Sequence, residues 1–226
     1  MRKKTNSKEK KVAKDKSPIV FQRDKISKNI SIDKRPDLNE TQKQIIEAAL
    51  DKNVKCIIID GVAGSGKSYT SILSSLELLN QKKVGQIIYV RSLVQSKDGE
   101  TGFLTGDLEE KTKYYNIPLY QTLEELISDS DIDYLNSENR ILTYPTSMLR
   151  SYNFHNSVIL GEEAQNMCWD SLYTITTRAG MFSKLFLIGD SINQNDLGSK
   201  SGFKKFCSIF SDQESMDNGF RFFKLT

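Results

Sequence analysis

The sequence predicts an α/β fold in which a mostly parallel sheet is covered by helices on both faces. Three observations support this prediction. Short apolar runs without alternation recur along the chain, as expected for strands that are buried on both faces. Segments with helical spacing of apolar residues lie between these runs, so strand and helix alternate. A glycine-rich segment joins one such strand to the helix that follows it.

Composition and charge divide the chain into two parts. The 226 residues are 38% hydrophobic and 27% charged, which fits one globular domain with a tail. Residues 1–16 contain eight Lys or Arg and two acidic residues, a net charge of +6, so the rest carries −3 of the total of +3. Lys, Asp, Ser and Asn dominate residues 1–37, which we interpret as a flexible basic arm. Residues 38–226 are expected to form the folded domain.

Two classes of protein are excluded by the apolar runs. The longest of them, such as Ile87–Val90, are far shorter than the roughly 20 residues of a membrane helix. The charged N-terminus has no apolar segment after it, so we expect no secretory signal, a cytoplasmic location and no membrane partner. The three cysteines lack the spacing of metal ligands.

Each predicted element has a local reason. Asn39 is a favourable N-cap with Gln42 three residues later, so the first helix is expected to end near Asp51. The β-branched and aliphatic runs predict strands at Cys56–Ile59, Gln86–Val90, Val158–Leu160 and Leu185–Ile188. Apolar spacing predicts helices at Ser68–Leu79, Leu119–Ser128, Asp170–Arg178 and Phe203–Phe210. Residues 92–115 are rich in Gly and charge and are expected to form a long loop or insertion.

The segment Gly61–Ser68 matches the pattern G-x-x-x-x-G-K-[ST] between a predicted strand and a predicted helix. Its glycines allow backbone N–H groups to turn toward an anion, and the helix N-terminus adds its positive dipole end. Lys67 can reach the β- and γ-phosphates, and the Ser68 hydroxyl suits Mg²⁺. The pattern therefore predicts a site for a nucleoside triphosphate.

Two carboxylates, Glu162 and Glu163, directly follow the predicted strand Val158–Leu160 and Gly161. Ligands of open parallel sheets bind at the carboxyl ends of the strands. One carboxylate can hold Mg²⁺ while the next acts on water. We assign Glu162 to the metal and Glu163 to the water. A second polar cluster, Gly189–Asp196, follows another predicted strand.

In chain order, these motifs resemble the PhoH-like ATPase family. This family is a RecA-like group of P-loop NTPases related to superfamily-one helicases and common in bacteria and bacteriophages. The resemblance covers about residues 38–223, and its most specific segment is Gly102–Lys111, which ordinary P-loop proteins lack. The other matching segments are Thr41–Lys43, Gly61–Ser68, Arg91, Met148–Arg150, Glu162–Asn166, Thr177–Gly180 and Gly189–Leu197.

The chain departs from the family pattern at four places. Glu162 stands where the family has Asp, and Gly161 beside it replaces a hydrophobic strand residue. Tyr152 occupies the second arginine position of the family's methionine-arginine motif, which removes one cation. The segment after Asp190 holds one residue more than the family pattern, so either Asn193 or Gln194 could be the phosphate sensor, and we favour Gln194. The domain is C-terminally short, because the sequence stops before a late arginine segment of the family.

The resemblance implies an enzyme that hydrolyses ATP with Mg²⁺, coupled to single-stranded RNA or DNA as a homo-oligomer. The location it implies is the cytoplasm, which is the host cytoplasm for a bacteriophage protein. Two alternatives stay open: a P-loop phosphotransferase and an ATP-binding assembly module with little turnover.

The resemblance also implies a set of site residues. The catalytic residues are Lys67, Glu163, Gln194 and Arg178, with Arg150 and Arg91 as alternative arginines. The metal ligands are Ser68 and Glu162. The nucleotide-binding residues are Gln42, Gly61, Val62, Ala63, Gly64, Ser65, Gly66, Lys67, Ser68 and Tyr69.

Overall fold

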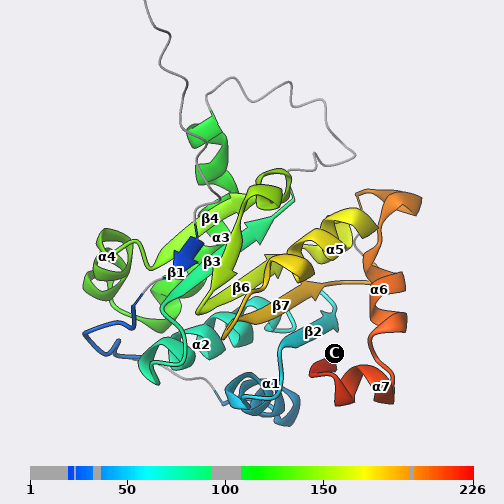
Figure 1. Cartoon of the computed structure of the whole chain (residues 1–226), viewed down its shortest axis with the longest axis horizontal. Coiled ribbons are helices and arrows are strands. Elements are labelled where there is room, and N and C mark those ends of the chain that lie inside the picture. The colour runs from blue at the N-terminus through cyan, green and yellow to red at the C-terminus, as the bar shows by residue number, and fades with distance from the viewer. Residues whose placement is uncertain (1–19, 23, 33–36, 93–107, 194–195) are drawn as a thin grey trace, which may run out of the picture.

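A six-stranded parallel sheet forms the centre of the molecule in the computed structural model (Figure 1). The structure describes residues 20–22, 24–32, 37–92, 108–193 and 196–226. Five parallel pairings join the six strands in the order β4-β3-β6-β7-β2-β8. In that order the strands are Ile141–Pro145, Gln86–Arg91, Ser157–Glu162, Lys184–Gly189, Cys56–Gly61 and Phe220–Leu225. All six strands therefore end at the same edge of the sheet.

Alternate residues of the central strands belong to two separate hydrophobic cores, one on each face of the sheet. In β2, Ile57 and Ile59 lie in the first core and Ile58 in the second. The first core is closed by α1 (Glu40–Leu50), α2 (Lys67–Asn80), α3 (Leu108–Leu126) and α4 (Asp129–Ser137). The second is closed by α5 (Trp169–Arg178) and α6 (Phe203–Ile209). Burial on both faces explains why these strands are apolar throughout.

Shorter elements complete the fold. The helix α7 (Gln213–Asp217) leads into β8, and the two-stranded sheet pairs β1 (Val20–Gln22) with β5 (Asn153–His155). In the part of the chain that the structure describes, three 3₁₀ helices lie in the connections: η1 (Thr146–Ser151), η2 (Ala164–Asn166) and η3 (Gly198–Lys200). Within the described residues, no helix is long and apolar enough to cross a membrane.

The predicted elements that position the site are confirmed. The α1 helix begins with the Asn39 cap, whose side chain accepts from the Gln42 N–H while the Gln42 side chain accepts from the Asn39 N–H, each at 2.9 Å. The four predicted strands correspond to β2, β3, β6 and β7. The α3 helix already begins at Leu108, so the prediction of a loop over residues 92–115 is wrong for its last part. The rest of that segment, residues 93–107, lies outside the described residues.

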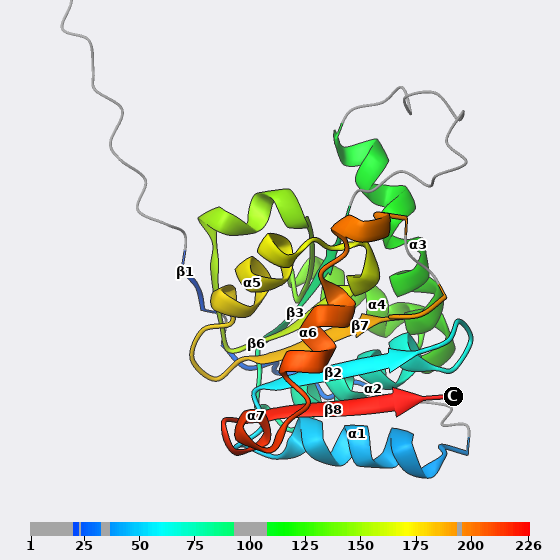
Figure 2. The same cartoon turned by 90° about the vertical axis from the view of Figure 1, so that its right-hand side faces the viewer.

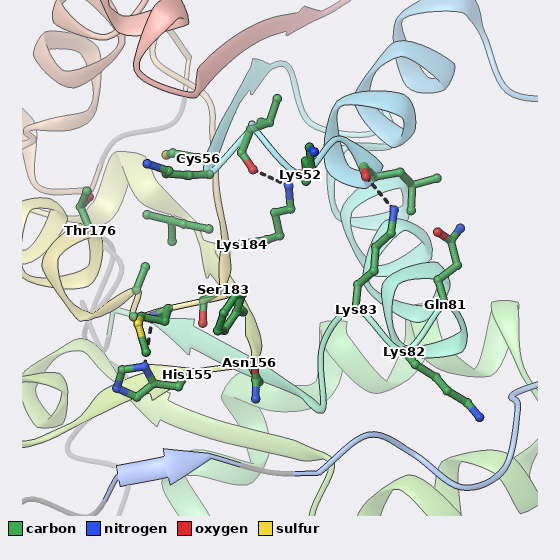
Figure 3. Close-up of a pocket in the computed structure, with 18 of the residues that line it drawn as sticks. Lys52, Cys56, Gln81, Lys82, Lys83, His155, Asn156, Thr176, Ser183 and Lys184 are labelled. Atoms are coloured by element: carbon green, nitrogen blue, oxygen red, sulfur yellow. Dashed lines mark hydrogen bonds between the residues drawn. The ribbon is translucent and has the colours of Figure 1, made fainter.

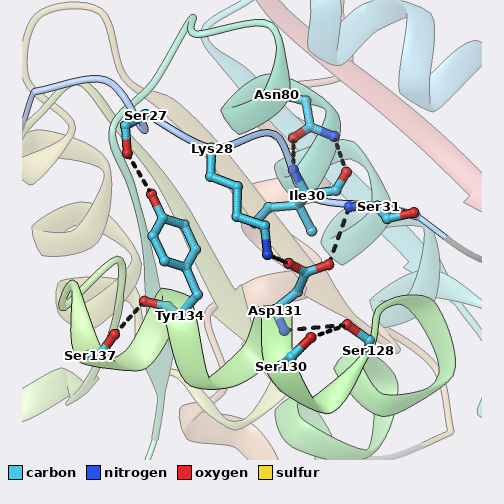
Figure 4. Close-up of polar contacts among 10 residues, drawn as sticks. All are labelled: Ser27, Lys28, Ile30, Ser31, Asn80, Ser128, Ser130, Asp131, Tyr134 and Ser137. Atoms are coloured by element: carbon cyan, nitrogen blue, oxygen red, sulfur yellow. Dashed lines mark hydrogen bonds and ion pairs between the residues drawn. The ribbon is translucent and has the colours of Figure 1, made fainter.

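The segment of residues 24–32, which composition assigns to the flexible arm, packs against the domain. Ile26 and Ile30 are buried in the first core. The Asn80 side chain of α2 bonds the Ile30 backbone twice, at 2.7 and 2.9 Å. On α4, Asp131 accepts from the Lys28 ammonium and from the Ser31 N–H (Figure 4). Composition misses this segment because its two isoleucines stand among charged residues. Ile26 and Ile30 are four positions apart, and both insert into the first core and anchor the segment to the domain. Residues 1–19 of the predicted arm lie outside the described residues.

Truncation of Ile26 tests this anchorage. Ile26→Ala is expected to lower the free energy of unfolding by about 2–4 kcal/mol, because it removes buried methyl groups and leaves a cavity. The matched control is Asn29→Ala, at an exposed neighbouring position, which should change stability little. Urea denaturation of the full chain measures both values. Equal stability of the two variants would show that the segment does not pack as described.

Candidate nucleotide-binding site at the strand ends

The phosphate loop connects the end of β2 to the start of α2, as the pattern predicts. Gly64 and Gly66 adopt left-handed backbone conformations with φ of 78° and 80°. These angles are favourable only without a side chain. The Lys67 Nζ atom donates to the carbonyl oxygens of Gly61 and Val62 at 2.8 and 2.6 Å. Burial lowers the pKa of Lys67, while the nearby carboxylates, Asp190 foremost, oppose this effect.

Gln42 lies against this loop. A Cβ atom built on Gly66 would lie 2.6 Å from the Gln42 Nε2 atom. The capping box fixes the start of α1, and the same Gln42 side chain thereby stands next to the first turn of α2. The structure thus brings Gln42 together with the loop Gly61–Ser68. Tyr69, one position further, packs partly against the first core.

Glu162 is a buried carboxylate at the end of β6, beside the phosphate loop. It is 6% exposed and interacts with the Ser68 side chain by a hydrogen bond. Its Oε1 atom is buried and has no hydrogen-bond partner among the described residues. Burial raises the pKa of Glu162 to about 7. A hydroxyl and an unsatisfied carboxylate oxygen side by side are hard oxygen donors that fit Mg²⁺, so Ser68 and Glu162 could hold this ion.

Glu163, the next residue in the chain, lies in a different environment from Glu162. Its backbone is left-handed, with φ 54°, a conformation that is uncommon outside glycine and concentrated at functional sites. The Glu163 Oε1 atom lies 3.6 Å from Arg91 Nη2 at the end of β3, and Oε2 accepts from Gln165 Nε2 at 2.6 Å. The two neighbouring carboxylates therefore differ: Glu162 is buried, and Glu163 is half-exposed and held by Arg91 and Gln165.

Gln165 links Glu163 to the next strand end. It is buried, and its Oε1 atom accepts from the Asp190 N–H at 3.1 Å. Asp190 in turn accepts from the N–H groups of Ile192 and Asn193 at 3.0 and 2.9 Å. Burial would raise the pKa of Asp190, but these hydrogen bonds outweigh it and lower the pKa. The carboxyl ends of β6 and β7 are thus joined through polar side chains.

Two more contacts fix this edge of the sheet. Asp60, at the end of β2, accepts from the N–H and the hydroxyl of Ser191 at 2.8 and 2.7 Å. Asn166 and Asp196 form two hydrogen bonds, of 2.9 and 2.8 Å. Sequence reasoning gave no role to Asp60, Ser191 or Gln165. The sequence feature that could have indicated a role for Asp60 is its position directly before Gly61, the first residue of the phosphate loop.

The structure does not bring Arg178 to the phosphate loop. Arg178 is the last residue of α5, and the chain continues from there into the start of β7. This end of β7 lies at the edge of the sheet opposite the phosphate loop (Figure 2). Its guanidinium donates to the Asn153 side chain at 3.2 Å. Of the alternative arginines, Arg150 is exposed in η1 and Arg91 pairs with Glu163. Gln194 lies outside the described residues.

The similarity to known proteins agrees with this arrangement. Residues 36–225 match the family described as PhoH-like protein. This chain belongs to the PhoH-like family. A PhoH-like protein from Synechocystis sp. is 32% identical over 177 residues, which cover 77% of this chain and 53% of that protein. Protein PhoH from Escherichia coli K12 is 33% identical over 180 residues, covering 78% and 50%. The chain spans about half the length of these curated relatives.

Among solved structures, the ATPase core of a Sulfolobus solfataricus SWI2/SNF2 protein in complex with double-stranded DNA is similar at 13% identity. The match has a TM-score of 0.43 and covers 87% of this PhoH-like chain and 45% of the other chain.

Neutralising Glu162 tests the cost of its burial. The Glu162 carboxyl loses its proton more readily in the unfolded chain, where its pKa is about 4.5, than in the folded chain, where it is about 7. The free energy of unfolding therefore falls as the pH rises from 4.5 through 7. Glu162→Gln removes this penalty. We expect the variant to be more stable by about 2–3 kcal/mol at pH 8 in EDTA, and by much less at pH 4.5.

Urea denaturation at the two pH values measures this difference. Glu124→Gln, at an exposed position of α3, serves as the control and should leave stability nearly unchanged. A Glu162→Gln variant that is less stable than the wild type at pH 8 would contradict a buried, unsatisfied carboxylate.

Proposed function

We propose that this PhoH-like protein binds ATP with Mg²⁺ and hydrolyses the γ-phosphate. The observation that carries the proposal is the pair of adjacent glutamates in different environments beside a phosphate loop. The buried Glu162 contacts Ser68, and the half-exposed Glu163 is oriented by Arg91 and Gln165. Glu162 is suited to bind a metal ion, and Glu163 is suited to contact the attacking water.

The residues of the phosphate loop and of the strand ends have different roles in the proposed reaction. The backbone N–H groups of Gly61–Ser68 and the Lys67 ammonium hold the phosphates. Mg²⁺ bound by Ser68 and Glu162 would supply positive charge next to the phosphate oxygens. Glu163 accepts a proton from the attacking water, and its contact with Arg91 keeps the carboxylate oriented. We assign the phosphate sensor to Gln194, since Asn193 bonds Asp190.

Arg91 replaces Arg178 as the arginine that we propose at the γ-phosphate. Arg91 is the last residue of β3, at the strand-end edge, and its guanidinium lies 3.6 Å from the Glu163 carboxylate, whereas Arg178 bonds Asn153 near the other edge. Positive charge is useful only where negative charge develops during transfer.

We further propose that hydrolysis is coupled to single-stranded RNA or DNA, with the protein acting as a homo-oligomer. Residues 1–16 carry a net charge of +6, which favours phosphate backbones irrespective of sequence.

Two substitutions test hydrolysis directly. Lys67→Ala should lower ATP turnover by about 100-fold or more, because it removes charge stabilisation of the transferred phosphate. Glu163→Gln should lower it by about 100-fold or more while ATP still binds, because the amide cannot accept the proton. Release of inorganic phosphate from purified protein measures turnover, and Lys204→Ala, at an exposed position, is the control.

The same assay separates the alternatives. Equal phosphate release in wild type, Lys67→Ala and Glu163→Gln would mean that the site does not hydrolyse ATP and would support an assembly module. Phosphate appearing on an added acceptor instead of in solution would support a phosphotransferase.

Nucleic-acid coupling has its own test. ATP turnover is expected to rise when single-stranded RNA or DNA is added, and binding should weaken steeply with salt. Deletion of residues 1–16 should reduce the salt dependence by about 0.7 logarithmic units per lost phosphate contact and leave turnover without nucleic acid unchanged. Absence of both stimulation and salt-sensitive binding would contradict the coupling.

A further inference from the structure

A wide groove opens at the edge of the sheet where the strands begin, opposite the phosphate loop. Its volume is about 1250 Å³. The walls come from the turn between α1 and β2, the turn between α2 and β3, the end of β5 and the connection from α5 to β7 (Figure 3). None of the residues assigned to nucleotide binding lines it. The groove is therefore separate from the nucleotide site.

The charge of this groove has one sign. Six of its lining residues are lysines and, among the described lining residues, none is Asp or Glu. The lysines are Lys25, Lys52, Lys55, Lys82, Lys83 and Lys184. The chain after residue 16 carries a net charge of −3, so these lysines concentrate positive charge on an otherwise acidic body. Such a concentration attracts an extended anion.

Two of the lysines belong to the wall itself. The Lys83 ammonium donates to the Leu50 carbonyl at 2.7 Å, and the buried Lys184 ammonium donates to the carbonyls of Asp51 and Val54. Figure 3 shows Lys83 and Lys184 reaching from separate segments toward the end of α1. Lys52 and Lys82 are exposed, so their ammonium groups are open to a ligand.

An exposed aromatic residue stands among these charges. Phe182 is 75% exposed, its neighbour Met181 is 67% exposed, and both line the groove. Phe182 adopts φ 60°, a left-handed conformation that a bulky side chain rarely takes. Surrounding structure must hold such a residue in place, and strain of this kind concentrates at binding sites.

The only histidine of the chain helps to hold this aromatic residue. The Met181 N–H donates to His155 Nδ1 at 3.0 Å, and the Asn156 N–H donates to the Met181 carbonyl at 3.0 Å. A Cβ atom on Gly180 would lie 2.6 Å from His155 Nδ1, so the loop approaches the ring closely. The turn that presents Phe182 is thus fixed by β5.

We propose that this groove binds single-stranded RNA or DNA, with lysines on the phosphates and Phe182 stacked on a base. Lysines without carboxylates suit a phosphate backbone, and an exposed aromatic ring suits an unpaired base. In a duplex the bases are covered by their neighbours, and an acidic polypeptide offers no base to stack. The inference rests on the nucleic-acid binding of the proposed function, to which it adds a contact on the folded domain besides residues 1–16, and it does not depend on ATP hydrolysis.

Binding of fluorescent oligonucleotides to the full chain tests the groove. Lys52→Ala with Lys82→Ala should weaken binding of oligo(U) or oligo(dT) by about tenfold or more and reduce the salt slope by about 1.4, the value for two lost contacts to a single strand. The charge-matched control, Lys204→Ala with Lys224→Ala, removes two exposed lysines outside the groove and should change binding much less.

The aromatic contact is tested by two variants of one residue. Phe182→Ala should weaken binding by about tenfold with an unchanged salt slope, and Phe182→Tyr should retain it. ATP turnover without nucleic acid should be the same in all these variants, so loss of binding with normal turnover supports the groove even if nucleic acid does not stimulate hydrolysis.

Three results would overturn the proposal. The first is wild-type protein that binds no single strand, and the second is equal binding by the groove pair and the control pair, which would move the contact to residues 1–16 or another face. The third is a combination of two observations: polyglutamate displaces the oligonucleotide at equal charge, and Phe182→Ala has no effect on binding. Together they would favour an acidic polypeptide as the ligand of the groove.

Discussion

Burial of the Glu162 carboxylate beside the Ser68 hydroxyl is the constraint on which the nucleotide site depends. One carboxylate oxygen is covered by protein and has no partner among the described residues, an arrangement that is unfavourable unless a cation completes it. The unfavourable group persists because the strand ends around it are tied together. Asp60 bonds Ser191 between β2 and the segment after β7, and Gln165 joins Glu163 to Asp190. Gly161 contributes by lacking a side chain, since its Cβ would lie 2.9 Å from Leu187 Cδ2.

The parallel sheet separates two surfaces of different chemistry. The phosphate loop and the glutamates lie where the strands end, whereas the lysine groove lies where they begin. The strands β2 and β7 run between the two, from Cys56 and Lys184 in the groove to Gly61 and Gly189 at the site. A nucleic acid held in the groove would leave the nucleotide site accessible. The sheet itself is the rigid element that both surfaces share.

Sequence alone predicts the elements whose signals are local and fails where partners are distant. The central strands and the phosphate loop follow from short apolar and glycine patterns, and the Asn39 cap follows from one residue pair. The edge strand β8 (Phe220–Leu225) is missed because Arg221 and Lys224 interrupt its apolar pattern. The sequence predicts Ser68, Glu162 and Glu163 around one site, but it does not reveal the opposite position of Arg178. Nor does it predict the groove, whose lysines come from four separate segments.

Thermal unfolding of the full chain with ATP tests the central claim most directly, namely that the buried carboxylate is there for a metal. Melting temperatures are compared in ATP with EDTA and in ATP with Mg²⁺, for wild type and for Glu162→Gln. A ligand that binds only the folded state raises the melting temperature. The account predicts a larger rise with Mg²⁺ in wild type and loss of this extra rise in Glu162→Gln. Equal rises in wild type with EDTA and with Mg²⁺ would contradict it.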